Sequence, residues 1–355
     1  MKGSFRVVTQ GLELAFKSLG VLDGVFFGET TDFDDELVGG AQSPIAVVTG
    51  DPMRVLQTHF HGQHKNQWLM LAPNSEGIPP SFVRQLKDMV KLPGGEKVPT
   101  LTGFLAPSRW AEGVLQREFP DHPVILCPHG VLPVFQVHEG SKRGDAFRLL
   151  HVSSSRLSRK GTVELVAAWK LLQKSRELPE GSTLRILVNP AFFDEFLGFV
   201  SEGIEVYHGQ NILPEVYARG LQNFNFVVQP SRAEGFGLVP LEARACGVPV
   251  IATGCTGHAT HMQGPGVVLV KHRDNALSDD YLGASAPTVR VEDVLKALEY
   301  GFDNRKGLQE EAKKYAGEIQ QSWSWERRVA PAVLQMKEHL DGNRGRIGLD
   351  ETLDL

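Results

Sequence analysis

The sequence predicts an α/β protein with two domains, each a parallel β-sheet with helices on both faces. Three observations lead to this fold. Short apolar runs alternate with longer amphipathic segments, which is the pattern of βαβ units. The length of 355 residues suits two domains of ordinary size. A charged, glycine-containing segment without apolar periodicity, 138–145, separates two series of alternating elements and marks the domain boundary.

The individual elements follow from the spacing of apolar residues. In the first half, helical spacing predicts helices at 5–19, 81–90 and 109–118, and apolar runs predict strands at 21–29, 44–51, 68–73, 100–108 and 124–130. Ser108 is expected to cap the helix that follows it. In the second half, we expect strands at 147–154, 184–190, 204–209, 224–231, 248–254 and 266–271, and helices at 162–174, 191–201, 214–221, from 291 onward and at 325–340.

Composition narrows the class of protein. The net charge of -5 gives no support to a chain that wraps nucleic acid or lies on an anionic membrane. The three cysteines form no CxxC pair, as expected of a reduced, intracellular chain. No apolar run is long enough to span a membrane, and the first residues do not resemble a signal peptide. We therefore expect a cytoplasmic protein.

The stretch SRAEGFGLVPLEARACGVPV, 231–250, carries the strongest chemical signal in the chain. It follows a predicted strand, and its Gly-Phe-Gly loop leads into a short helix. Pro240 is expected at the first helical position, where a missing N–H costs nothing. Gly247 is expected to end that helix, and Pro249 prevents its continuation. Free amides at a glycine-flanked helix start bind phosphate oxygens, so the stretch predicts a site for an anionic ligand.

Glu234 and Glu242 bracket this loop, eight residues apart. A carboxylate near free amides can accept hydrogen bonds from two vicinal hydroxyls, so one acid can face a sugar and the other a ribose. Each acid alone has a plainer explanation. Glu234 can be a solvated loop residue, and Glu242, expected in the first helical turn, can simply complement the helix dipole. The full set of strand, loop, helix and second strand favours the ligand site.

A polar loop after the strand expected at 147–154 adds positive charge. Arg156 and Lys160 lie in this loop, and Arg159 can replace either one. Two cations at the carboxyl end of a strand can neutralise a diphosphate leaving group. Taken in isolation, the pair is better explained as solvated surface charge.

These motifs resemble a known family. The spacing E-x7-E, present here as EGFGLVPLE, is the signature of the large retaining GT-B glycosyltransferase group, and PSRAEGFG and ACGVPVIAT match its flanks. The chain resembles family 4 of these enzymes. The resemblance implies a GT-B fold, in which two Rossmann-like domains face each other across a cleft and a C-terminal helix crosses back to the first domain. The domains expected are an acceptor-side domain, a donor-binding domain, and that helix with a polar tail, at 1–142, 143–322 and 323–355.

The resemblance also implies roles for single residues. Glu242 is expected to bind the donor ribose, Glu234 to lie by the donor sugar, and Arg156 and Lys160 to contact the phosphates. We assign Glu234, Arg156 and Lys160 to catalysis. Further donor contacts are expected from loop residues and from two positions elsewhere: Gly235, Phe236, Gly237, Leu238, Gly3 and Thr256. Gly3 would be the remnant of a glycine loop, because the sequence begins at the end of the strand that normally precedes the first helix.

The first half resembles the family more loosely, in APSRWAEGVL, VILCPHGVLPVF and NSEGIPPSF, at 106–115, 124–135 and 74–82. Glu76 of the last segment is a possible cleft contact, as is Arg159. The cluster HFHGQH invites a metal interpretation, but no cysteine or carboxylate stands at a metal-like spacing. The resemblance implies a metal-independent enzyme. The resemblance also implies a histidine near this position that contacts a substrate in the cleft, and His59, His61 and His64 are the candidates.

The resemblance implies transfer of a sugar with retention of configuration, by front-side attack on a nucleoside diphosphate sugar. No cofactor is expected beyond this co-substrate, for which a UDP-sugar is the first choice. The acceptor stays open among a lipid carrier, a glycan, a small metabolite, a protein and a modified DNA base of the kind that phage-type enzymes glycosylate. Two other functions are compatible with this fold: a non-catalytic nucleotide-sugar binding module, and a sugar-nucleotide epimerase.

Overall fold

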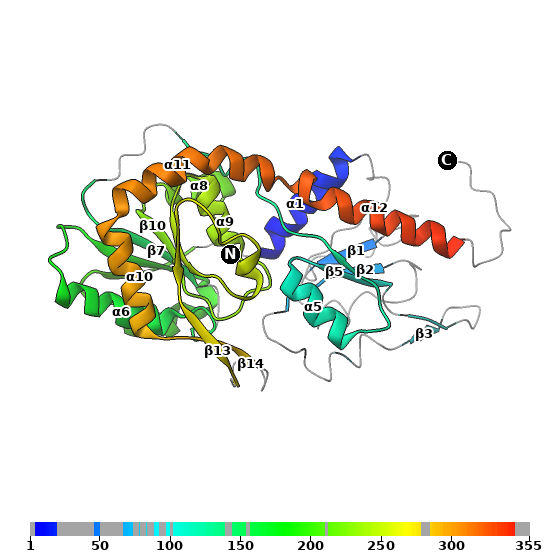
Figure 1. Cartoon of the computed structure of the whole chain (residues 1–355), viewed down its shortest axis with the longest axis horizontal. Helices are drawn as coiled ribbons and strands as arrows, with labels where there is room; N and C mark the ends of the chain where they lie inside the picture. The colour runs from blue at the N-terminus through cyan, green and yellow to red at the C-terminus, as the bar shows by residue number, and fades with distance from the viewer. Residues whose placement is uncertain are drawn as a thin grey trace. The chain divides into compact units, whose positions relative to one another are not determined.

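The computed structural model describes most of the second half of the chain and parts of the first: residues 4–19, 46–49, 67–73, 78, 83, 89–91, 97–99, 102–138, 144–153, 157–209, 212–277 and 285–344. The chain divides into two compact units (Figure 1). Unit 1 comprises Met1–Val7, Ala72–Ile78 and Val131–Ser324, and unit 2 comprises Val8–Leu71, Pro79–Gly130 and Trp325–Leu355. The domain limits inferred from the sequence stay predictions.

Unit 1 is built on a six-stranded parallel sheet in the order β12-β11-β10-β7-β8-β9. Its strands are β7 (Arg148–Ser153), β8 (Thr183–Val188), β9 (Ile204–His208), β10 (Phe226–Gln229), β11 (Val250–Thr253) and β12 (Val267–Val270). The helices α6 (Thr162–Ser175) and α10 (Val291–Asp303) pack together on one face, and α8 (Pro214–Leu221), α9 (Leu238–Ala245) and α11 (Arg305–Ser322) lie on the other (Figure 1). This is the doubly wound arrangement that the alternating pattern predicts.

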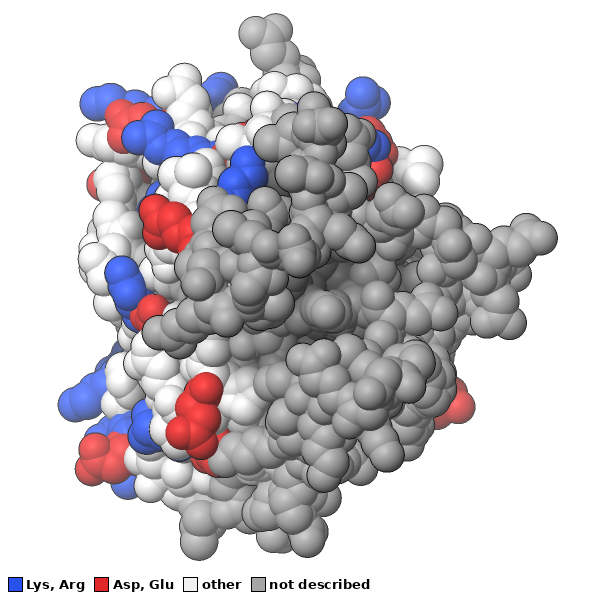
Figure 2. Space-filling view, turned by 90° about the vertical axis from the view of Figure 1, so that its right-hand side faces the viewer, with Lys and Arg blue, Asp and Glu red and all other residues white. Residues whose placement is uncertain are grey.

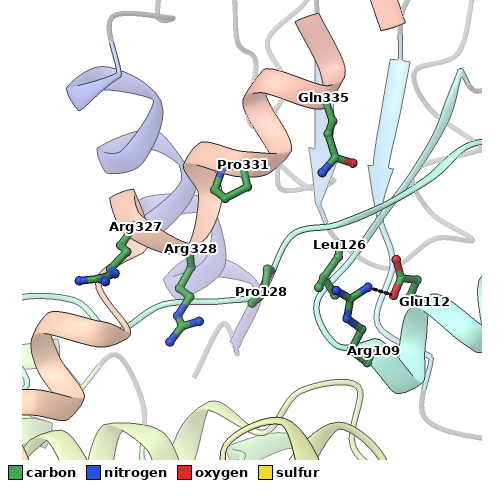
Figure 3. Close-up of a pocket in the computed structure, with 8 residues that line it drawn as sticks. All are labelled: Arg109, Glu112, Leu126, Pro128, Arg327, Arg328, Pro331 and Gln335. Atoms are coloured by element: carbon green, nitrogen blue, oxygen red, sulfur yellow. Dashed lines mark hydrogen bonds and ion pairs between the residues drawn. The ribbon is translucent and has the colours of Figure 1, made fainter. Parts of the chain in front are cut away.

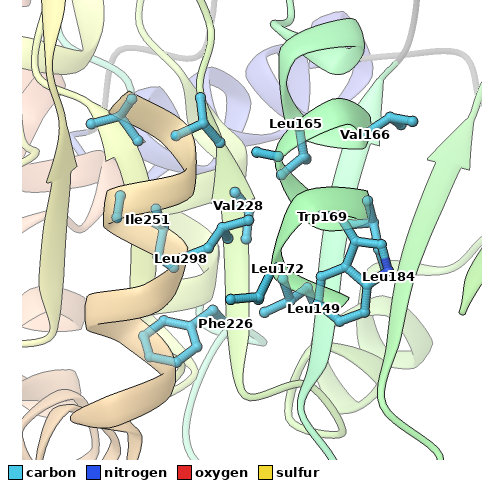
Figure 4. Packing of buried hydrophobic residues seen from close by; sticks show 14 of the residues in the cluster. Leu149, Leu165, Val166, Trp169, Leu172, Leu184, Phe226, Val228, Ile251 and Leu298 are labelled. Atoms are coloured by element: carbon cyan, nitrogen blue, oxygen red, sulfur yellow. The ribbon is translucent and has the colours of Figure 1, made fainter. Parts of the chain in front are cut away.

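The core of unit 1 lies between its sheet and the pair of helices α6 and α10. Phe226 and Val228 of β10 point toward Leu298 of α10, and Leu149 of β7 lies beside Trp169 of α6 (Figure 4). All five side chains are fully buried. Burying large apolar side chains drives folding, at about 25 cal/mol per Å² of apolar surface removed from water.

Two elements of unit 1 differ from the sequence expectation. The helix expected at 191–201 is broken into η2 (Pro190–Phe192), α7 (Phe193–Phe196) and η3 (Leu197–Phe199). Gly198, a poor helix former, lies in the last of these turns. An antiparallel pair, β13 (His272–Leu277) and β14 (Ser285–Val289), follows the central sheet and was not predicted. Apolar and polar residues alternate only weakly along these two strands, because most of the residues of the pair are polar.

Unit 2 contains a four-stranded parallel sheet in the order β1-β2-β5-β6. Its strands are β1 (Ala46–Thr49), β2 (Gln67–Met70), β5 (Gly103–Ala106) and β6 (Val124–Leu126). The helix α5 (Arg109–Glu118) starts as predicted, with the Ala111 amide donating to Ser108 Oγ at 3.1 Å. The strands β3 (Met89–Lys91) and β4 (Lys97–Pro99) form a small antiparallel pair. The expectation of a helix reaching residue 90 is therefore wrong at its end, where β-branched Val90 pairs with Val98.

Two further helices belong to unit 2. They are α12 (Trp325–Arg344) and, from Val8 onward, α1 (Ser4–Ser18). Trp325 is fully buried and anchors the start of α12. Its indole lies against Gly11 of α1, and its backbone passes Gly130, where an added Cβ would come within 2.6 Å. Trp325 therefore has a structural role, as the buried residue that fixes the start of α12 against α1. Among the described residues, no helix has both the length and the apolar character that crossing a membrane requires.

This packing makes a prediction for Gly11. A methyl group at Gly11 would overlap the Trp325 indole. We expect Gly11→Ala to destabilise the protein by about 1–3 kcal/mol, the usual cost of overpacking. Chemical denaturation of the purified variant measures this.

Gly317→Ala is the matched control, because Gly317 also lies inside a helix but has open space where the Cβ would be. This variant is expected to gain about 0.5–1 kcal/mol from helix propensity. Equal effects at Gly11 and Gly317 would contradict the packing described for Trp325.

Candidate active site

The connection between β10 and α9 forms one side of the candidate site. The loop ends at Gly237, whose φ of +90° is in the left-handed region that favours glycine. A side chain there would also collide with the His258 imidazole. The helix begins at Leu238, two residues before the predicted start, so Pro240 is its third residue. Its missing N–H is still harmless, because the first four amides have no partner within the helix. Glu242 accordingly lies in the second turn, and not in the first as predicted.

Glu234 lies at the centre of a buried cluster of charges. Lys160 Nζ donates to Glu234 Oε1 at 2.6 Å, and Arg159 Nη1 lies 3.2 Å from Glu234 Oε2. The three side chains are only 10–11% exposed. The solvated-loop explanation of Glu234 is therefore wrong, and so is that of Lys160. The sequence left open that Arg159 replaces Arg156 or Lys160. In the structure both Arg159 and Lys160 contact the Glu234 carboxylate, and Arg156 lies outside the described residues.

Backbone contacts hold the same loops together. The Arg159 side chain also donates to the Ala233 carbonyl at 3.0 Å, and the Arg232 amide donates to the Arg159 carbonyl at 2.8 Å. Lys160 directly precedes Gly161, the left-handed N-cap of α6, which lies against the Pro230 carbonyl. The loop before α6 and the loop before α9 are thus joined by several bonds at the carboxyl end of adjacent strands β7 and β10.

The turn after β11 completes the cluster. The Glu234 amide donates to Thr256 Oγ1 at 3.0 Å, and the Gly257 amide donates to the Glu234 carbonyl at 2.8 Å. Thr256 has a φ of +52°, and it is the one non-glycine residue with positive φ in the described part of the chain. Such a conformation costs about 1–2 kcal/mol, which these bonds offset. The sequence predicted Thr256 at the site, and in the structure its hydroxyl is bonded to the Glu234 amide.

Two buried histidines, His258 and His151, extend the cluster. Burial lowers the pKa of His258 to about 4, and the nearby carboxylate of Glu234 opposes this shift. His151, on β7, contacts the Val228 carbonyl at 2.8 Å and Thr162 Oγ1 at 2.9 Å. Burial lowers its pKa to about 4 as well. Both rings are therefore neutral at pH 7. A polar residue inside the apolar run LLHVSS was the available sequence signal for His151.

The two glutamates have opposite electrostatic properties. Burial would raise the pKa of Glu234, but the charges of Lys160 and Arg159 outweigh it and hold that pKa well below its usual range. Glu242 is buried in α9, and burial raises its pKa to about 8. Glu234 is therefore an ionised, paired carboxylate, whereas Glu242 is protonated at pH 7 in the ligand-free protein.

The remaining predicted site residues divide into two groups. Gly235, Phe236 and Leu238 belong to the loop and to the start of α9, and the Phe236 ring packs against His261 with 4.7 Å between ring centroids. Six predicted residues lie outside the described part of the chain: Gly3, His59, His61, His64, Glu76 and Arg156.

Among the residues that are described, no three His, Cys, Asp or Glu side chains gather as a metal ion would need.

Comparison with known proteins defines the class. Residues 213–331 match the model of a family described as Family 4 Glycosyltransferase in conflict systems. The D-inositol 3-phosphate glycosyltransferase of Paenarthrobacter aurescens is 28% identical over 230 residues, covering 61% of this chain and 52% of that protein. The enzyme of the same name from Geodermatophilus obscurus is 35% identical over 120 residues, covering 34% of this chain and 22% of that protein. The chain thus spans about half, or less, of the length of these curated relatives.

Solved structures share the fold. Sucrose-phosphate synthase from Thermosynechococcus elongatus superposes with a TM-score of 0.62 at 16% identity, covering 86% of this chain and 76% of that one. A glycosyltransferase from Rickettsia africae gives 0.60 at 15% identity and covers 94% of both chains. HepE of Anabaena, in complex with UDP and glucose, gives 0.56 at 11% identity, covering 85% and 78%.

The fold is therefore that of the GT-B glycosyltransferases, as the sequence predicted. Within that class, the predicted resemblance to family 4-like glycosyltransferases is confirmed by the family match and by the curated relatives.

The raised pKa of Glu242 makes stability depend on pH. The ordinary pKa is 4.5 and the folded value is about 8. The folded state therefore holds this proton more tightly, so the stability that Glu242 contributes is complete below pH 4.5 and is lost as pH rises toward 8. Glu242→Gln removes the titration. We expect the free energy of unfolding of this variant, relative to the parent, to rise by at least about 1.4 kcal/mol between pH 5 and pH 9, the equivalent of one pKa unit.

Denaturant unfolding of both proteins across this pH range measures the difference. Other titrating groups are common to the two proteins and cancel. A difference that stays constant from pH 5 to pH 9 would show that Glu242 is not the buried acid described.

Proposed function

We propose that the protein transfers a sugar from a nucleoside diphosphate sugar to a hydroxyl group, with retention of configuration. The observation that carries this proposal is the buried cluster of Glu234, Lys160 and Arg159 beside the first turn of α9. Relatives with this fold include a UDP complex, which makes a UDP-sugar the first donor to test. The names of the curated relatives support glycosyl transfer as the activity.

The charges suit a diphosphate. With Glu234 ionised and His258 neutral, the two cations leave the cluster with a net positive charge. The free amides of the first turn of α9 add the positive end of a helix dipole. The charge cluster and the first turn of α9 both lie at the carboxyl end of the sheet, which is where parallel α/β folds bind ligands. A diphosphate there would be stabilised further as its leaving-group charge develops.

The proposed reaction needs no cofactor and no covalent intermediate. The bond between the sugar C1 and the β-phosphate oxygen breaks, and a bond between C1 and the acceptor oxygen forms on the same face. The acceptor proton passes to the leaving phosphate oxygen, and the nucleoside diphosphate is released. Lys160 and Arg159 would stabilise the leaving group, Glu234 would hold both cations and lie by the sugar, and Glu242 would accept the ribose hydroxyls.

The rival functions differ in what the cluster must do. A non-catalytic binding module has no need to keep three charges buried together, because their desolvation costs several kcal/mol per ion unless they are paired. The acceptor can also be a modified DNA base, which is one of the acceptors that the sequence leaves open. A thermal-shift screen of UDP-, GDP-, ADP- and dTDP-sugars identifies the donor, and an acceptor screen that includes hydroxymethylated DNA then separates these cases.

Lys160→Ala tests the phosphate role. Removing one preorganised charge or donor from a transition state usually lowers the rate about 10²–10³-fold. We expect this loss in the rate of nucleotide release from the donor that the screen identifies. Lys170→Ala is the control, since Lys170 is an exposed lysine on α6 that lies outside the cluster. If Lys160→Ala and Glu234→Ala both turn over like the parent, the assignment of the site is wrong.

Glu242 couples donor binding to a proton. Ribose hydroxyls that donate to Glu242 would favour its ionised form, so binding at pH 7 is expected to release close to one proton. Donor affinity should then increase with pH up to about 8 and level off above it. Calorimetric titration at pH 7 in two buffers of different ionisation enthalpy counts the protons. Equal proton release by the parent and by Glu242→Gln would refute the ribose role.

A further inference from the structure

The strands β7 and β10 meet where the sheet of unit 1 changes direction. In the order β12-β11-β10-β7-β8-β9, the chain runs outward on both sides of this pair. The helices that follow the two strands, α6 and α9, lie on opposite faces of the sheet (Figure 1). Parallel α/β folds bind ligands in the crevice that opens at such a point. The contacts that hold the carboxyl ends of β7 and β10 therefore set the geometry of the candidate site.

Side chains replace the backbone ladder at this end of the two strands. Backbone pairing of β10 with β7 covers two residue pairs and stops one residue before His151. Beyond it, the His151 ring contacts the Val228 carbonyl of β10 at 2.8 Å. In the opposite direction, the Gln229 side-chain amide donates to the Val152 carbonyl of β7 at 3.0 Å. Both side chains are buried, and they bridge the strands beyond their last backbone pair.

The direction of each hydrogen bond around His151 follows from its partners. A carbonyl oxygen only accepts, so the bond to Val228 requires a proton on His151 Nδ1. The ring is neutral at pH 7, because burial lowers its pKa to about 4. Its Nε2 therefore accepts from the Thr162 hydroxyl at 2.9 Å. Since the Thr162 proton is then committed, Ser153 Oγ donates to Thr162 Oγ1 at 3.2 Å. One directed chain of hydrogen bonds thus runs from Ser153 to β10.

This chain of hydrogen bonds holds the first residue of α6. Thr162 begins the helix, and Gly161, at its N-cap, has no side chain with which to cap it. His151 and Ser153 bind the Thr162 hydroxyl instead, so the position of the helix start depends on β7. Lys160 stands two residues before Thr162 and is placed by the same stretch of backbone.

A buried charge needs accurate placement more than an exposed one does. On the described part of the face in Figure 2, positive and negative side chains lie side by side at the surface, where water and salt screen them. Arg109, on the wall of a pocket of unit 2, pairs with Glu112 but is 76% exposed, and such pairs contribute little (Figure 3). Lys160 is only 11% exposed and lies 2.6 Å from Glu234. A shift of about 1 Å in a group of this kind can lower the rate of a reaction about 100-fold.

We propose that His151 is a positioning residue that sets where the Lys160 ammonium stands. Its ring ties β7, β10 and the start of α6 together at the crevice of the sheet. The inference rests on the proposed function, in which Lys160 stabilises the leaving phosphate. His151 is fully buried and exchanges no proton in the reaction, so it acts through Thr162 and Lys160. A histidine that only filled the core would stabilise the fold but would not change the part of the rate that Lys160 supplies.

Two substitutions at His151 separate its two bonds. The amide of Asn reaches the place of Nδ1, so His151→Asn keeps the bond to Val228 and loses the acceptor for Thr162. The amide of Gln reaches the place of Nε2, so His151→Gln restores that acceptor. For nucleotide release from the donor, we expect His151→Asn to lower kcat at least about tenfold and to leave KM within about threefold. His151→Gln should keep kcat within about threefold of the parent.

Substitutions of Thr162 test the other end of the same bond. Thr162→Val lacks the hydroxyl and should lower kcat as His151→Asn does, whereas Thr162→Ser keeps the hydroxyl and should resemble the parent. Thr183→Val is the matched control, because Thr183 is also a buried threonine of unit 1 but its hydroxyl has no hydrogen-bond partner among the described residues. It should turn over like the parent. Thermal melts show that each variant is folded.

A double-mutant cycle tests whether the effect passes through Lys160. In Lys160→Ala the ammonium is already absent, so adding His151→Asn should lower kcat by no more than about a further twofold. A second loss of about tenfold in the double variant would overturn the proposal, because a purely structural effect is independent of Lys160. Parent kcat in both His151→Asn and Thr162→Val would overturn it as well.

Two measurements on the resting protein separate this proposal from the proposed function. Nitrogen NMR of the histidine rings should find the His151 proton on Nδ1, and a proton on Nε2 would overturn the proposal. Unfolding of Lys160→Met, Glu234→Gln and the double variant gives the coupling free energy between Lys160 and Glu234. This coupling should fall by at least about half in the His151→Asn background, and an undiminished coupling would also overturn the proposal. If both expected results appear in a protein that turns over no nucleotide sugar, the proposed function is refuted and His151 still positions Lys160.

Discussion

The buried contact of Glu234 with Lys160 and Arg159 is the interaction on which the candidate site depends. It joins two loops that are 74 residues apart in the chain but follow neighbouring strands of one sheet. Desolvated charges are stable only when paired, so removing Glu234 would leave two buried cations without their counterion. The two loops are therefore held in one relative position before a ligand arrives. A site organised in this way loses little free energy to rearrangement when charge develops in it.

The two glutamates of the signature show how environment sets the state of an acid. Glu234 and Glu242 are the same residue type, eight positions apart, and both are buried. The paired one is ionised and the one within the helix holds its proton. Opposite shifts of neighbouring carboxyl groups are the usual sign that they have different tasks. The pattern E-x7-E defines the two positions, but the cations that separate their pKa values come from another loop.

The sequence by itself determined the class of fold and the location of the candidate site around Glu234. Alternating apolar runs define parallel strands because a buried strand and an amphipathic helix need different spacings. Local signals were equally dependable: Ser108 caps α5, Pro214 opens α8 and Gly247 ends α9 with positive φ. These features depend on a few neighbouring residues, so they can be inferred without knowing the tertiary structure.

Only the tertiary structure decided which polar residues meet. The spacing of Arg159 and Lys160 on a loop is compatible with solvated charge, and only the adjacency of β7 and β10 brings them to Glu234. The contacts of His151, the position of Glu242 in the second turn of α9, and the polar β13–β14 pair were equally beyond local pattern. Such contacts depend on sheet order and helix packing, which arise from the fold as a whole and leave no mark in the spacing of a single segment.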